Sequence, residues 1–225
     1  MHCHAVYATL FAFALVSTSA TASLSPADHP VFGQASLTRD SQSGLDWLTP
    51  NEIVGLSFTQ TKVLITTDKR FAGFRVASLD ELQGLYLAAS IPDINVPGSG
   101  ALYGTPENVA GVEFLQTLTG ITYSVTSGGL KLNETAGYVG ETFISSINGF
   151  TSVYIGNVVL RNNVPTQTGP VSFASAYTTW GAMLVGTQTV GVGTWLVTTV
   201  PEPSIWLMFS FGLLALAQRR ARVVA

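Results

Sequence analysis

The apolar residues of this 225-residue chain gather at its two ends, and this distribution limits where a folded domain can lie. Residues 5–16 form one uncharged apolar run, and residues 204–218 form a second. The end segments 1–22 and 201–225 hold 15 apolar residues each, and without them 75 of the remaining 178 residues are apolar. That share, about 42%, is ordinary for a globular domain. The apolar excess therefore belongs to targeting segments, which argues against a polytopic membrane protein.

The N-terminal segment has the layout of a secretory signal peptide. Its run of 12 residues is too short to span a bilayer, and the small, polar stretch that follows contains Ala20 and Ala22 as an A-x-A cleavage site. We therefore expect export by the Sec machinery and removal of residues 1–22. A buried N-terminal helix is the alternative, which the Ser/Thr/Ala tract disfavours. Cys3 is the only cysteine, so the mature chain would have no disulfide, thiol nucleophile or cysteine zinc ligand.

The C-terminal segment combines a proline-rich break, an apolar run and a basic end. Pro201, Glu202 and Pro203 precede residues 204–218, and the arginines that follow are Arg219, Arg220 and Arg222. As a helix, 15 residues extend about 22 Å, and arginine side chains can snorkel to make up part of the ~30 Å hydrocarbon core. The sequence thus predicts a single transmembrane helix over 204–218 with the arginines on the cytoplasmic side and the domain outside. A plain tail anchor is the alternative interpretation.

These C-terminal residues resemble the PEP-CTERM sorting signal of Gram-negative bacteria, whose three parts occur here in the same order. The resemblance implies that exosortase, a membrane enzyme, recognises Pro201, Glu202 and Pro203 and cleaves near them. It also implies a precursor held transiently at the inner membrane, followed by delivery to the cell envelope or to an exopolysaccharide-containing biofilm matrix. The two prolines disfavour helix before the membrane, and Glu202 places one charge at the interface.

Residues 23–200 are expected to form the exported globular domain, with flexible pieces at 23–34 and 162–169. A Ser/Asp/Gly turn between short apolar arms predicts a hairpin over 35–48. Capping boxes at Ser57 and Ser78 predict helices over 58–64 and 79–89, and Thr105-Pro106 begins a helix that ends at Gly120. Short β runs follow residue 121. Early helices and a β-rich second half predict an α+β fold.

A second resemblance covers about 30 positions of this domain. The sequence motifs in segments 40–48, 74–82 and 193–197 are similar to those of the DUF1566-like exported domains and occur in the same order. Those domains are related to C-type lectin-like folds. In that fold the first and last strands pair, so the resemblance implies that Trp47 and Trp195 share one core. The chain lacks the calcium-site and disulfide motifs of sugar-binding lectins.

The residue inventory argues against most catalytic chemistry. Net charge is −3 and no basic run exists, which disfavours nucleic acid as a partner. His29 is the only histidine of the mature chain, so neither a Ser-His-Asp site nor a histidine zinc site is expected, and we expect no cofactor and no metal. Asp40 and Asp46 lack the alternating oxygen ligands of a calcium loop, which favours turn capping.

These observations predict a non-enzymatic exported protein of the envelope or matrix. The first alternative is a lectin-like module that binds polysaccharide or protein, with Tyr177 and Trp180 as candidate glycan-stacking residues. The second is a matrix glycan hydrolase, since a carboxylate pair need not be close in sequence.

Overall fold

The computed structural model describes residues 23–92, 94–95, 104–145, 149–164 and 166–200. These residues form a mostly β structure of two sheets, with about 45% in strands and 26% in helices. The predicted α+β, C-type lectin-like fold is therefore wrong. The reason is that strands of 14 and 15 residues replace the short β runs expected after residue 121, and that residues 23–34, expected to be flexible, also form strands. The predicted transmembrane helix 204–218 lies outside the described residues, and none of the helices described is long and apolar enough to cross a bilayer.

The smaller sheet, sheet A, is antiparallel throughout and combines strands from both ends of the domain. Its strands are, in spatial order, β1 (Leu24–His29), β2 (Gly33–Asp40), β3 (Leu45–Leu48), β11 (Leu196–Thr199) and β4 (Arg75–Val76). The predicted hairpin is the β2–β3 pair. Residues 23–34, which were expected to be flexible, instead supply β1 and the start of β2.

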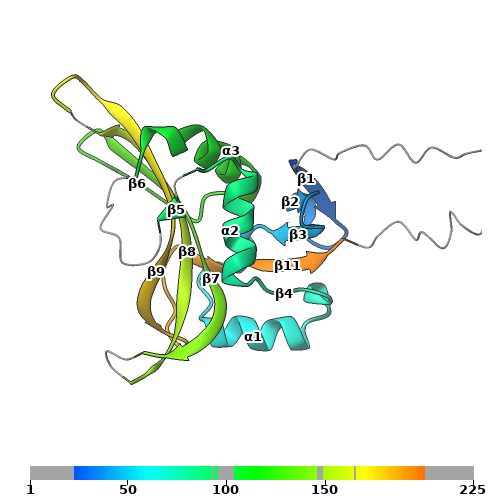
Figure 1. Ribbon diagram of the computed structural model, residues 1–225. Coiled ribbons are helices and arrows are strands. Elements are labelled where there is room, and N and C mark those ends of the chain that lie inside the picture. Colours follow the sequence, from blue (N-terminus) through cyan, green and yellow to red (C-terminus); the bar gives the residue numbers. More distant parts are fainter. Residues whose placement is uncertain (1–22, 93, 96–103, 146–148, 165, 201–225) are drawn as a thin grey trace, which may run out of the picture.

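The larger sheet, sheet B, is built around three long antiparallel strands (Figure 1). Its spatial order is β10 (Val192–Thr194), β7 (Leu130–Ile144), β8 (Thr151–Val164), β9 (Val171–Leu184) and β5 (Ile94–Asn95). The short outer strands β10 and β5 run parallel to their neighbours, and β6 (Tyr123–Ser127) pairs with the first half of β7. A bulge between Val139 and Phe143 bends β7 toward its end.

Three α-helices connect the sheets, and the predicted caps begin two of them. Ser57 and Ser78 each accept a hydrogen bond from the backbone N–H three residues later, and the side chain at that position returns one, so both capping boxes are confirmed. Gly120 ends the third helix, as predicted, with φ +77°. The helices are α1 (Phe58–Thr67), α2 (Leu79–Ala88) and α3 (Val109–Thr119), with short 3₁₀ segments at Pro50–Ile53, Lys69–Phe71 and Pro106–Asn108.

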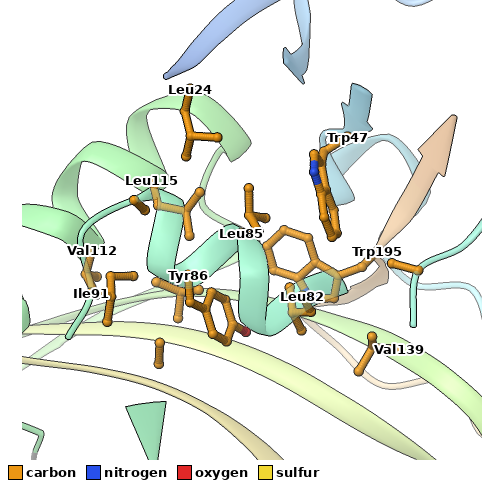
Figure 2. Packing of buried hydrophobic residues seen from close by; sticks show 14 of the residues in the cluster. Leu24, Trp47, Leu82, Leu85, Tyr86, Ile91, Val112, Leu115, Val139 and Trp195 are labelled. Atoms are coloured by element: carbon orange, nitrogen blue, oxygen red, sulfur yellow. The ribbon is translucent and has the colours of Figure 1, made fainter. Parts of the chain in front are cut away.

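Helix α2 lies between the two sheets and carries the centre of the core (Figures 1 and 2). Leu82, Leu85 and Tyr86 are fully buried, as the 3.6-residue spacing of apolar positions requires. Trp47 and Trp195 meet edge to face with ring centroids 6.2 Å apart, so the prediction that they share one core is confirmed.

Two glycines let Trp195 lie directly on sheet B. Gly137 of β7 and Gly156 of β8 are opposite each other in the ladder. A Cβ at Gly137 would lie 2.9 Å from Trp195 Cδ1, and one at Gly156 would lie 2.1 Å from Leu82 Cδ2. The indole Nε1–H donates to the carbonyl oxygen of Gly156 at 3.0 Å. The bare backbone thus provides both space and a hydrogen-bond acceptor for the indole.

The two ends of the described domain meet at the β2–β3 turn. The Ser41 N–H donates to the Ser23 carbonyl at 3.2 Å, and the Val200 N–H donates to the Gly44 carbonyl at 2.9 Å. Strand β1 begins, and strand β11 ends, at this same end of sheet A (Figure 1). The segments that precede residue 23 and follow residue 200 are therefore attached side by side.

Candidate functional site

The first candidate site is the attachment of the C-terminal segment. Strand β11 lies between β3 and β4, where Val197 pairs with Trp47 on one side and with Arg75 on the other. The strand ends at Thr199, two residues before Pro201. The predicted sorting residues Pro201, Glu202 and Pro203 and the arginines Arg219, Arg220 and Arg222 lie outside the described residues, as do Ala20 and Ala22. The sequence that follows the domain therefore starts almost directly from a strand whose first two residues, Leu196 and Val197, are buried and paired on both sides.

The second candidate is a polar cluster around Tyr177 on sheet B. Tyr177 of β9 is half-buried, and the side chains of Arg161 and Asn157 of β8 interact with its hydroxyl. Burial raises the pKa of Tyr177, and the nearby Glu134 carboxylate raises it further, against the opposing effect of Arg161. Burial likewise raises the pKa of Glu134, again offset in part by Arg161. Tyr177 is thus engaged by its neighbours, and its glycan-stacking role stays a prediction.

Arg161 bridges this cluster along the sheet. In the ladder Arg161 is opposite Phe173, whereas Tyr177 is opposite Asn157, so the guanidinium reaches back along β8 to the tyrosine. Two polar atoms beside this path, Arg161 Nη1 and Ser175 Oγ, are buried without a hydrogen-bond partner. Trp180, the other predicted stacking residue, belongs to β9, but its side chain lies outside the part of the structure described.

The aspartates of the β2–β3 turn serve the turn itself. Asp40 Oδ1 accepts from the backbone N–H groups of Gln42 (2.9 Å) and Ser43 (3.3 Å), and Oδ2 accepts from the Ser43 hydroxyl at 2.7 Å. Asp46 accepts two hydrogen bonds from Arg39, at 2.9 and 2.8 Å. Turn capping is confirmed for Asp40, and Asp46 is the acid of an ion pair.

His29 is likewise used by the fold. Its Nδ1 accepts from the backbone N–H groups of Val31 and Phe32 at 3.2 and 3.3 Å. Its ring packs against Phe32 and Phe74, with centroid distances of 4.9 and 5.5 Å. The imidazole is therefore part of the local packing of the β1–β2 turn.

The third candidate is a cleft of about 550 Å³ that sequence reasoning missed. It lies where α1, β4 and the start of α2 face the bulged end of β7. An aromatic pair, Phe143 and Tyr154, forms part of its wall, with ring centroids 4.6 Å apart and planes 30° from parallel. The bulge creates this pairing, because three residues of β7 intervene between Val139 and Phe143, whereas their partners on β8 are two residues apart. No local sequence pattern signals such a contact.

One charged residue of the cleft lining, Arg75, is held in an ion pair with Glu81, and three others make no ion pair within the part of the chain that the structure describes. Arg75 donates to both carboxylate oxygens of Glu81, at 2.8 and 2.5 Å, and Glu81 also accepts from the Ser78 N–H. The Arg75 hydrogen bonds, together with that backbone contact, lower the pKa of Glu81 to about 2. Lys62, Asp80 and Glu141 also line the cleft, are exposed, and make no ion pair among the described residues.

Comparison with known families identifies only the C-terminal segment. Residues 199–222 match the model of the PEP-CTERM protein-sorting motif. No curated protein and no solved structure gives a significant match to the chain. The resemblance to DUF1566-like and C-type lectin-like domains therefore has no support. The sorting motif indicates an exported protein that is recognised by exosortase and processed at the membrane.

Proposed function

We propose that this chain is a non-enzymatic component of the cell envelope or extracellular matrix, exported by Sec and released from the inner membrane by exosortase. The observation that carries the proposal is the sorting motif over residues 199–222, which begins on the last residue of β11. Because β11 is paired on both sides, the mature C-terminus stays within sheet A after cleavage near Pro201. The processed product is then the intact two-sheet domain.

The side chains described support a non-enzymatic role. Histidine is the residue that general acid–base catalysis uses most often, and His29 Nδ1 accepts hydrogen bonds from two backbone N–H groups at the β1–β2 turn. The free carboxylates of the cleft, Asp80 and Glu141, are solvent-exposed, whereas the acid of a glycosidase lies in an apolar pocket. The hydrolase alternative therefore lacks a favourable site in the cleft.

Processing is tested by comparing the chain in otherwise identical cells with and without exosortase. We expect intact-mass measurement to show loss of about 25 C-terminal residues only in cells that have the enzyme, with the product in the envelope or medium. Replacement of Pro201, Glu202 and Pro203 by alanine should abolish this shortening. Pro106 and Glu107, an exposed Pro-Glu pair in the domain, provide the matched alanine control. Identical chain lengths in both cell types would overturn the proposal.

A polysaccharide-binding role is the second candidate, and the cleft favours it. Aromatic rings beside unpaired carboxylates provide both contacts that a sugar requires, a surface for its C–H face and acceptors for its hydroxyls. This candidate is independent of the Tyr177 cluster.

A further inference from the structure

We propose that the cleft between α1, β4, α2 and β7 binds a neutral or amino-bearing glycan and disfavours uronate-containing glycans. The inference deepens the proposed matrix role, on which its biological meaning rests. It assigns a binding surface to residues that no sequence motif marks.

The cleft has an apolar wall suited to one face of a sugar ring. Phe143 and Tyr154 stack at 4.6 Å, and Tyr154 also packs against the core, so the pair is anchored from behind. Phe143 is half-buried and forms the outer member of the wall. A pyranose has an apolar C–H face that packs on aromatic rings.

The backbone of the β7 bulge sets the shape of the cleft. The Gly140 N–H donates to the Ala77 carbonyl at 2.8 Å, which ties the bulge to the end of β4. Gly140 has φ +76°, and a Cβ there would lie 3.3 Å from Leu79 Cγ. The bulge therefore lies close to the start of α2. As a result, Glu141 of the bulge and Asp80 of α2 line the same cleft.

The charges of the lining select among glycans. Arg75 is neutralised by its ion pair with Glu81, which lies beside the cleft, so the lining residues without an ion pair in the described structure are one lysine, Lys62, and two acids, Asp80 and Glu141. Exposed carboxylates are strong acceptors for sugar hydroxyls and for an ammonium group. A uronate would place its carboxylate near Asp80 and Glu141, which outnumber Lys62, and this like-charge contact is unfavourable.

The edge of the cleft that the first turn of α2 forms is held in place by hydrogen bonds in the absence of a ligand. The Ser78 capping box and the two Arg75–Glu81 hydrogen bonds fix the first turn of α2, which carries Asp80. Ordering flexible side chains costs free energy on binding, so a fixed edge favours affinity.

Binding is measured by isothermal titration calorimetry on the exported protein with three probes: cellohexaose, chitosan hexamer and hexagalacturonate. We expect the first or second to bind, and hexagalacturonate to bind at least about tenfold more weakly than the better of them. Phe143→Ala should weaken binding by about tenfold or more. Glu141→Ala should weaken it by about three- to tenfold, since it removes one charged acceptor.

Two controls distinguish the cleft from a general surface effect. Tyr123→Ala removes an exposed aromatic ring of β6, and Glu113→Ala removes an exposed acid of α3, and both should bind as wild type does. Glu141 is exposed, so its variant tests the site even where Phe143→Ala fails to fold.

Three results would overturn the inference: no binding of either non-anionic probe, preference for hexagalacturonate, or unchanged affinity of both cleft variants. Exosortase-dependent shortening, measured on the same variants, reports separately on the proposed function. Release of reducing ends from a probe would instead support the hydrolase alternative and contradict a purely binding cleft.

Discussion

Replacing Gly156 with alanine tests whether helix α2 and Trp195 are held on sheet B by bare backbone. The new Cβ would lie 2.1 Å from Leu82 Cδ2 and 3.1 Å from Trp195 Nε1, so Leu82 must retreat by roughly 1.5 Å to reach normal contact. Leu82 is fully buried, and its movement displaces the centre of the core. Overpacking of this kind costs about 1–3 kcal/mol, partly offset by the ~0.5–1 kcal/mol that Gly→Ala contributes through the unfolded state.

We therefore expect Gly156→Ala to lower the free energy of unfolding by about 1–2 kcal/mol in urea denaturation followed by circular dichroism. Gly84→Ala, in the exposed part of α2 with no atom within 4 Å of the new Cβ, is the control and should stabilise by up to about 1 kcal/mol. In the double variant with Leu82→Ala, the clash disappears and the two costs should be less than additive. Additive costs, or a Gly156→Ala protein as stable as wild type, would refute this account of the core.

Three further perturbations have defined outcomes. Glu81→Gln should destabilise the protein by up to about 1 kcal/mol at pH 7. The folded-state pKa of Glu81 is about 2, whereas its ordinary value is 4.5. Urea titrations should therefore show that the difference in unfolding free energy between wild type and variant vanishes as the pH falls from 4.5 toward 2. Asp40→Ala should cost about 1–2 kcal/mol, whereas EDTA should leave the melting temperature unchanged; a chelator effect would restore the calcium interpretation. Tyr138→Phe removes a buried hydroxyl that donates to Thr187 O at 3.0 Å, and a loss of about 1 kcal/mol in denaturant unfolding is expected.

The parts of the fold that depend on local chemistry could be predicted from the sequence. Ser57 and Ser78 begin helices because a serine followed three residues later by Gln or Glu satisfies backbone donors within one turn. Gly120 ends α3 because it adopts a positive φ without strain. The β2–β3 turn follows from Asp40, whose carboxylate bonds to the next residues along the chain.

The parts that depend on distant pairing could not be predicted in this way. Strand β7 includes polar residues and two glycines, which locally favour turns, yet it runs for 15 residues because β6, β8 and β10 pair with it. The α+β prediction failed at this point, because only short β runs were expected after residue 121 where the structure has long strands. The cleft depends on the same long-range effect, since the bulge of β7 brings Phe143 to Tyr154 and Glu141 near Asp80.

Both ends of the domain lie at the β2–β3 turn, so its first and last residues are close together in space. Ser23 and Val200 are each bonded to a residue of the 41–44 turn, so a short peptide would join them without disturbing sheet A. New ends could then be opened at the exposed Gly128–Gly129 turn between β6 and β7. A circularly permuted chain of this design would keep every strand pairing while moving the attachment of both end segments from sheet A to the β6–β7 turn of sheet B. The native arrangement thus places the starting points of both end segments at one turn of sheet A, away from the cleft at the bulged end of β7.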